Sequence, residues 1–451
     1  MKHLESTTRS AIEKAAFEKA LRHLDGGFGD LPAFETLAPA GGGIEPVLME
    51  AAERLRDNYP YFHPLYAGQM LKPPHPVARM AYALAMWINP NNHALDGGRA
   101  SSAMEKEAVA QIAAMFGWRE FLGHLTGGGT MANLEALWVA GQLDPGKTIL
   151  ASAGAHYTHQ RIGGVLKLPF EAIPTTPDGS MDCAALAQRA AKGDIGCVVA
   201  TLGTTGTGSV DALPEILRLR DRFGFRVHVD AAYGGYFTLA DNLNPAARAA
   251  FDRAHEANSI VIDPHKHGLQ PYGCGCVLFR DPAVGALYRH DSPYTYFSSN
   301  DLHMGEISLE CSRSGAAAVA LWATQRLLPL VAGGDFAAGL SSSRAAALEL
   351  SRQLSESPAW IVPFEPELDI VVWAPRAASA SEASARSQQI FDRAAANHLH
   401  LALIQLPASH FSLADWDADR DHVLCLRSVL MKPEHSAWIG EIAARLNLAA
   451  S

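Results

Sequence analysis

The sequence predicts an α/β protein: a large domain with a mostly parallel sheet and helices on both faces, followed by a smaller α/β domain. Three observations support this class. Short apolar strands alternate with helical segments through the middle of the chain, which is typical of βαβ units. A turn or helix signal follows each of these strands. The chain has 451 residues, too many for one ordinary hydrophobic core, so we expect two or three packed units.

Residues 1–75 are expected to form an N-terminal segment of helices and loops. Residues 9–25 have the apolar spacing of an amphipathic helix. The following stretch is rich in glycine and proline, and it favours a helix only around residues 45–58.

Residues 76–330 are expected to form the large domain. Residues 77–87 are predicted to be helical, and the sequence Ser-Ala-Met-Glu at 102–105 is the capping-box pattern of a second helix that ends before Gly117. Five short apolar runs then predict strands: 148–151, 197–202, 227–231, 260–263 and 276–279.

Residues 331–451 are expected to form a small C-terminal α/β domain. A long helix over 315–328 leads into it, and a second helix is expected over 336–355. Three apolar segments predict its strands: 368–373, 399–406 and 422–430.

Composition excludes several classes of protein. Hydrophobic residues make up 48% and charged residues 19%, the balance of a compact globule, and a net charge of −10 argues against a nucleic-acid partner. The six cysteines form no CxxC pair and the 19 histidines show no metal-binding spacing, so no metal site is expected. Neither a signal peptide nor a membrane span is predicted, which favours a cytoplasmic protein.

Two motifs suggest a site for a phosphorylated, aromatic ligand. The glycine-rich sequence TGGGTMAN, residues 126–133, leads into a helical run, so its backbone N–H groups and the helix dipole can bind a phosphate. His156 follows the strand at 148–151, at the sheet edge where ligands collect in open α/β sheets. Its imidazole can stack on an aromatic ring, with His159 as a nearby competitor.

Two further motifs provide a carboxylate and an amine. Asp230 ends an apolar strand, where a desolvated carboxylate needs a positive partner such as a protonated pyridine nitrogen. Lys266 lies in the turn Asp-Pro-His-Lys-His-Gly after the next strand. A desolvated lysine with neighbouring cations loses proton affinity and can form an imine. Together the four motifs match what pyridoxal 5'-phosphate (PLP) requires.

The sequence at this point resembles the group II PLP-dependent amino-acid decarboxylases, especially the shorter tyrosine, aspartate and glutamate enzymes. The resemblance rests on TGGGTMANLEAL, AHYT, LGTTGTGSVD, HVDAAYGG and DPHKHG, and it runs from about residue 60 to 325. It implies a large domain of fold type I (aspartate-aminotransferase-like) with a mostly parallel seven-stranded sheet. It also implies a homodimer with active sites at the interface, acting on a small amino-acid substrate.

The resemblance assigns roles to individual residues. Lys266 matches the lysine that forms a Schiff base with PLP, Asp230 the partner of the pyridine nitrogen, and His156 the stacking histidine. Ala232 matches the small residue against the other ring face, and Thr204 a threonine near the ring hydroxyl. The positions that contact phosphate are matched by Gly128, Gly129, Thr130 and His265.

The reaction itself depends on residues outside these motifs. In the family a tyrosine on a mobile loop commonly protonates the carbanion, and Tyr294 and Tyr296 are the candidates here, although both could instead pack in an interface. Arg313, in a block resembling SR-G, and His93 are candidates for binding the substrate. The segment around 88–102 is only loosely similar to the family, which leaves the substrate amino acid open.

Two alternatives to decarboxylation stay open. A carbon–carbon lyase or an aminotransferase of the same fold would use the same lysine and aspartate, so the cofactor motifs do not separate these reactions. A non-catalytic protein of this fold is the other alternative, and the intact Lys266 and Asp230 argue against it.

Overall fold

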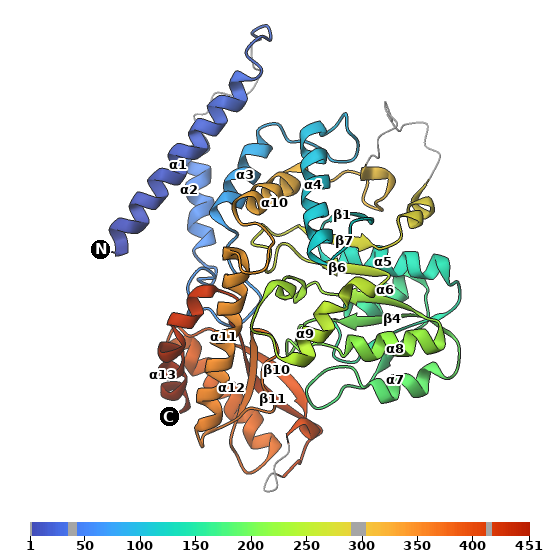
Figure 1. Ribbon diagram of the computed structural model, residues 1–451. Coiled ribbons are helices and arrows are strands. Elements are labelled where there is room, and N and C mark those ends of the chain that lie inside the picture. Colours follow the sequence, from blue (N-terminus) through green and yellow to red (C-terminus); the bar gives the residue numbers. More distant parts are fainter. Residues whose placement is uncertain (1, 35–42, 290–303, 412–416) are drawn as a thin grey trace.

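The computed structural model describes residues 2–34, 43–289, 304–411 and 417–451 (Figure 1). The helices of this part of the chain are α1 (Lys2–Gly26), α2 (Ile44–Leu55), α3 (Pro76–Met86), α4 (Arg99–Met115), α5 (Gly129–Leu143), α6 (Thr158–Leu166), α7 (Cys183–Ala190), α8 (Leu213–Phe223), α9 (Pro245–Asp252), α10 (Gly315–Leu327), α11 (Asp335–Glu356), α12 (Ala380–Ala396) and α13 (Ile439–Ala450).

A large, mostly parallel sheet forms the centre of the molecule, as predicted. Its strands are β1 (Leu122–Thr126), β2 (Thr148–Ser152), β3 (Phe170–Ile173), β4 (Ile195–Thr201), β5 (Arg226–Asp230), β6 (Ser259–Ile262) and β7 (Gly275–Phe279). Within the described residues it has seven strands in the order β1-β7-β6-β5-β4-β2-β3. Only β7 runs antiparallel to its neighbours, so the carboxyl ends of β2, β4, β5 and β6 share one edge.

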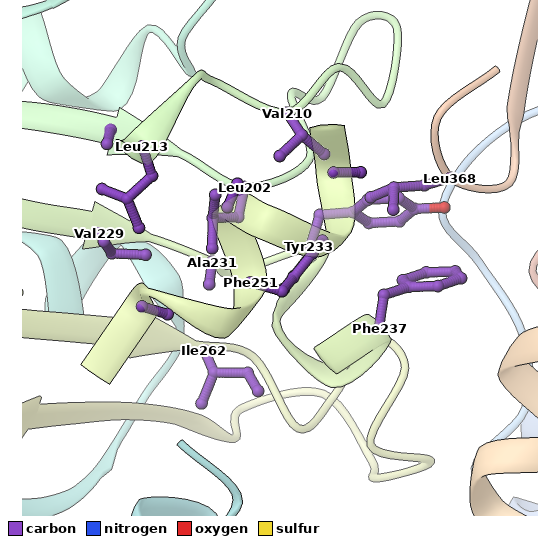
Figure 2. Packing of buried hydrophobic residues seen from close by; sticks show 14 of the residues in the cluster. Leu202, Val210, Leu213, Val229, Ala231, Tyr233, Phe237, Phe251, Ile262 and Leu368 are labelled. Atoms are coloured by element: carbon purple, nitrogen blue, oxygen red, sulfur yellow. The ribbon is translucent and has the colours of Figure 1, made fainter. Parts of the chain in front are cut away.

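The central strands are buried on both faces, which explains their nearly continuous apolar sequences. Every residue of β4 and β6 is buried. Figure 2 shows Leu202, Tyr233 and Leu368 converging beside the ends of β4 and β5. Leu368 lies in the C-terminal part of the chain, between two strands of the second sheet, so the core of the large sheet continues into that part.

The C-terminal part forms an antiparallel sheet in the order β10-β11-β9-β8, with bounds β8 (Trp360–Ile361), β9 (Ile370–Pro375), β10 (Ala402–Pro407) and β11 (His422–Val429). Helices α11 and α12 pack against it around Trp373, and α13 packs against these two helices. The α/β character expected for this region is confirmed. The expected domain boundaries at residues 75 and 330 stay a prediction, with the two sheets falling on either side of the second.

The predicted capping box was wrong. Helix α4 begins at Arg99, four residues earlier than the box requires, with Gly98 as its N-cap. Ser102 and Glu105 are buried inside the helix, and the Glu105 carboxylate accepts hydrogen bonds from the Leu125 N–H and the Asn92 amide. Glu105 therefore makes buried polar contacts, and the Ser-x-x-Glu pattern does not mark a helix start.

Helices α1 and α2 stand at one side of the molecule (Figure 1). Every residue of α2 is exposed, including Val47 (66% exposed) and Leu48 (62%). In the described part of the chain, no helix is both long and apolar enough to cross a membrane.

Candidate active site

A cavity of about 510 Å³ lies at the carboxyl edge of the large sheet. Its walls come from the turn before α5, the segment before α6, the ends of β4 and β5, and the turn after β6. The lining residues are Gly127, Gly128, Gly129, Thr130, Met131, Asn133, Leu134, His156, Thr158, Thr201, Gly203, Thr205, Asp230, Ala232, Tyr233, Asp263, His265, Lys266, Tyr272, Gly273 and Glu310.

The glycine-rich turn directs main-chain N–H groups into this cavity at the start of α5. Gly128 has a φ of 146°, a conformation that essentially only glycine adopts. A side chain at Gly129 would begin 2.6 Å from Asp263 Oδ2, so the close approach of that carboxylate also requires glycine. The Gly127 N–H already donates to the Glu310 carboxylate (2.9 Å), which shows that the turn can hold an anionic group.

Asp230 lies at the last position of β5 and is 5% exposed. Its Oδ1 accepts a hydrogen bond from the Ala232 N–H (3.0 Å), and its Oδ2 accepts one from His159 Nε2 (2.9 Å). Burial alone would raise the pKa of Asp230, but the hydrogen bond and charge of His159 hold it well below its usual range. The cavity therefore contains a buried, ionised carboxylate.

Lys266 extends from the turn after β6, and its Nζ is 3.1 Å from Asp263 Oδ2. The sequence predicted neighbouring cations around this amine. The structure instead places a carboxylate beside it. His265 Nδ1 donates to the Cys274 carbonyl (2.7 Å), and its Nε2 lies 3.6 Å from the same Asp263 oxygen. The amine therefore has a carboxylate as its immediate neighbour.

His156 is half-buried at the cavity wall, in the loop between β2 and α6. Its Nδ1 accepts a hydrogen bond from the Thr158 N–H (3.2 Å) and lies 2.7 Å from the Thr158 hydroxyl. The Tyr157 ring stacks on it with centroids 4.4 Å apart. Burial lowers the pKa of His156, which Asp230 opposes and Lys266 reinforces, so the imidazole is neutral at pH 7.

These residues fit PLP on structural grounds. The buried carboxylate of Asp230 suits a protonated ring nitrogen, and the N–H groups at the start of α5 suit a phosphate. Lys266 is 19% exposed at the cavity and suits an imine-forming amine. Ala232 and His156 both line the cavity, and a small and a flat side chain suit the two faces of a ring.

The cavity brings together almost all of the residues expected at the cofactor: Gly128, Gly129, Thr130, His156, Asp230, Ala232, His265 and Lys266. Thr204 differs from the expectation. Its hydroxyl bonds within its own turn, to the Thr207 hydroxyl (2.8 Å) and the Ser209 N–H (3.1 Å). Among the described residues, its neighbours Gly203 and Thr205 line the cavity in its place.

The residues expected at the substrate are not among those that line the cavity. His93 Nδ1 lies 3.4 Å from the exposed Cys311 thiol. Arg313 Nη1 donates to Glu105 (2.8 Å) and to the Leu125 carbonyl (2.5 Å), whereas its Nε and Nη2 have no partner within the described residues. Tyr294 and Tyr296 lie outside the residues that the structure describes.

Sequence reasoning missed several residues of this site, among them His159, Tyr272 and Glu310. His159 was considered only as a competitor of His156, yet it hydrogen-bonds Asp230. Tyr272 and Glu310 line the cavity without belonging to a motif that was assigned a role. Their positions close to the lysine turn and to Arg313 were the only available signals.

A comparison with protein families finds one match. The model described as "Pyridoxal-dependent decarboxylase conserved domain" matches residues 141–373, just over half of the chain.

Curated relatives agree with this match. L-tyrosine decarboxylase of Enterococcus faecium is 30% identical over 386 residues, covering 63% of each chain. A probable L-aspartate decarboxylase of Halobacterium salinarum is 31% identical over 264 residues, covering 58% of this chain and 70% of the relative. The match thus spans less than two thirds of the length of the tyrosine decarboxylase.

Solved structures show that the fold is shared. Oryza sativa TDC, determined with PLP and tryptamine, has a TM-score of 0.79 at 18% identity, covering 100% of this chain and 97% of its own. Mouse CSAD in its apo form has a TM-score of 0.78 at 18% identity, covering 95% and 92%. The architecture of the chain is therefore that of fold-type I decarboxylases.

Proposed function

The chain belongs to the pyridoxal-dependent decarboxylase family, and from this premise we propose that it converts an L-amino acid into the corresponding amine and CO2 with PLP as its cofactor. The observation that supports this most is the single cavity at the sheet edge. It combines an anion-binding turn, a buried ionised carboxylate and a lysine amine, which are the three groups that PLP needs from a protein.

Each group at the cavity has one task in this proposal. The start of α5 would hold the phosphate through N–H groups and the helix dipole. Asp230 would hold a proton on the ring nitrogen, and His156 would cover one ring face. When bound, PLP supplies an electron sink for the pair left behind when a bond to the substrate α-carbon breaks.

Lys266 would hold the cofactor through its Nζ. Asp263, whose Oδ2 is 3.1 Å from Nζ, would hold this amine in position. Tyr272 and Glu310 line the same cavity and would restrict how a substrate lies in it. The bond that breaks is decided by orientation, so the group that binds the α-carboxylate selects decarboxylation over other reactions.

Arg313 and His93 remain our candidates for binding the substrate, and Tyr294 and Tyr296 for protonating the product. Two nitrogens of the buried Arg313 guanidinium, Nε and Nη2, lack a partner among the described residues, which suits a residue that receives an anion. A cytoplasmic location also stays a prediction.

We also propose a homodimer with the active site at the interface. The support is α2, whose apolar side chains Ile44, Val47, Leu48, Met49 and Leu55 are all at least 60% exposed. An apolar helix face of this kind gains free energy when it is covered by a protein partner.

Trapping the cofactor on its lysine tests the proposal directly. Borohydride reduction of the PLP-loaded protein should attach the cofactor to the peptide that contains Lys266, as measured by mass spectrometry. The Lys266→Ala variant should bind PLP without becoming labelled and should form no amine. Labelling of a different lysine in the wild-type protein would overturn the assignment.

A further inference from the structure

We propose that His159 is a positioning residue that holds Asp230 charged and correctly oriented for the ring nitrogen of the cofactor. The proposal rests on the proposed function, because it assumes that PLP binds above Asp230. It assigns a role to a side chain that does not itself line the cavity.

The geometry fixes the Asp230 carboxylate at both oxygens. His159 Nε2 is 2.9 Å from Oδ2, and the Ala232 N–H is 3.0 Å from Oδ1. The two side chains are 1% and 6% exposed, so water contributes little to this arrangement. With two donors on opposite oxygens, the plane of the carboxylate is set before a ligand arrives, and each oxygen keeps a further lone pair for it.

The direction of the hydrogen bond between His159 and Asp230 follows from the acceptor. An ionised carboxylate only accepts hydrogen bonds, so Nε2 is the donor. Nδ1 is buried and has no hydrogen-bond partner among the described residues. An unsatisfied buried polar atom destabilises the fold. Stability alone therefore gives a poor reason for histidine at this position, whereas donation to Asp230 gives a specific one.

One turn of chain supplies both histidines of the site. The His159 N–H donates to the His156 carbonyl (3.2 Å), and α6 continues from there. This turn presents His156 to the cavity and His159 to Asp230. The residue that would cover the ring face and the residue that would support the ring-nitrogen partner are thus fixed relative to each other.

The other titratable side chains near Asp230 do not donate to its carboxylate. His228, two residues earlier on β5, has both ring nitrogens engaged, with Asn133 Oδ1 (2.8 Å) and with Ser259 Oγ (2.9 Å). His156 bonds with Thr158, and Lys266 lies beside Asp263. His159 is the side chain that donates to the carboxylate in the described part of the site.

The test uses enzyme reconstituted with PLP labelled with ¹⁵N at the ring nitrogen, whose NMR shift reports directly whether that nitrogen is protonated. His159→Leu removes the donor, and His159→Gln replaces it with an amide N–H. At neutral pH we expect a protonated ring nitrogen in the wild type. In His159→Leu the ratio of protonated to unprotonated ring nitrogen should fall about tenfold. This corresponds to a decrease of about one unit in the pKa of that nitrogen. His159→Gln should recover most of the wild-type signal.

His124→Leu is the matched control. His124 Nε2 is also 2.9 Å from a carboxylate, Glu135 Oε2, and both side chains are fully buried, but neither residue lines the cavity. This variant should lose thermal stability to a similar degree and keep the wild-type ¹⁵N signal. Should His159→Leu fail to fold, His159→Asn replaces it, because its shorter amide does not reach Asp230 and the same loss is expected.

The outcomes separate this inference from the proposed function. A wild-type enzyme that forms amine, together with a His159→Leu or His159→Asn variant whose ring nitrogen is as protonated as in the wild type, overturns the role of His159 alone. A wild-type protein that takes up no labelled PLP, or that holds it with an unprotonated ring nitrogen, overturns both.

Discussion

Asp230 carries a charge in a place where a charge is costly, at the buried end of a central strand. Asp230→Asn keeps the size of the side chain and an acceptor for the Ala232 N–H, but it removes the negative charge opposite the ring nitrogen. We expect kcat to fall by roughly 10²–10³, the scale seen when one preorganised electrostatic group is lost. Steady-state kinetics at saturating PLP measures this, and a kcat close to the wild-type value would exclude the proposed role.

A single buried histidine, His435, makes the stability of the fold depend on pH. It is fully buried, with Nδ1 accepting from the Lys432 N–H (3.2 Å), and burial lowers its pKa to about 4. Below pH 6.5 His435 binds a proton in the unfolded chain but not in the folded chain. The free energy of unfolding therefore decreases as the pH falls toward 4.

His435→Asn preserves an acceptor for this N–H and does not titrate. Between pH 7.5 and pH 5, the free energy of unfolding of the wild type should fall by roughly 2 kcal/mol more than that of the variant. Urea denaturation at the two pH values measures the difference. If the free energies of unfolding of the two proteins differ by the same amount at both pH values, His435 does not titrate as described.

At the level of single residues, the motifs predicted most of the residues that line the cavity, whereas the substrate-binding residues stay a prediction. Asp230 ends β5, and Lys266 and His156 lie in the segments that follow β6 and β2, so the shared sheet edge brings the three together. Arg313 and His93 were expected by resemblance, and their environment depends on contacts across more than 180 residues, such as that of Arg313 with Leu125. Local sequence contains no information about such contacts.

The turn before α5 is the element whose backbone matters most for the site. Gly128 needs its φ of 146°, and an alanine there would be strained by about 1–3 kcal/mol although space for its methyl group exists. Gly128→Ala should therefore distort the turn and raise the Kd for PLP at least roughly tenfold, as measured by equilibrium dialysis of the reconstituted protein.

Gly146→Ala provides the comparison for this variant. Gly146 also has a positive φ (76°) with open space around it, but it lies at the far end of α5 from the cavity. It should lose stability and keep the wild-type affinity for PLP. Equal loss of affinity in both variants would mean that general destabilisation, and not the shape of the turn, weakens binding.

Two strands of the large sheet, β1 and β3, were not predicted from hydrophobic periodicity. β1 contains Gly123 and His124, which are poor strand formers by composition, yet His124 is buried and paired with Glu135 on α5. β3 is an edge strand with two exposed residues and lacks an apolar run. Both strands form because neighbouring strands pair with them, which is a tertiary effect.

On the scale of the whole molecule, the C-terminal part of the chain holds the site in place. Asp369, just before β9, accepts from the Tyr233 hydroxyl (2.5 Å) and lies 3.2 Å from His267, the residue after Lys266. The alternation of strands and helices predicted the large sheet. It could not predict this connection, or that β7 inserts antiparallel between β1 and β6, because both depend on long-range packing.

The proposed dimer can be tested on the same scale. Changing Val47 and Leu48 together to Asp places two charges on the exposed apolar face of α2. We expect light scattering to show a dimer for the wild type and a monomer for the double variant, with loss of amine formation. Val165→Asp, at a 67% exposed position on α6, should remain dimeric. A double variant that is still dimeric would exclude α2 from the interface.

The central claim is amino-acid decarboxylation at the cavity around Lys266. The purified, PLP-loaded protein should be mixed separately with each common amino acid, 2,4-diaminobutyrate and DOPA, and the released CO2 measured. We predict CO2 and an equal amount of amine from one substrate class, abolished in Lys266→Ala. No CO2 from any of them, with the absorbance of bound PLP still changing on addition of an amino acid, would contradict decarboxylation and point to lyase or aminotransferase chemistry.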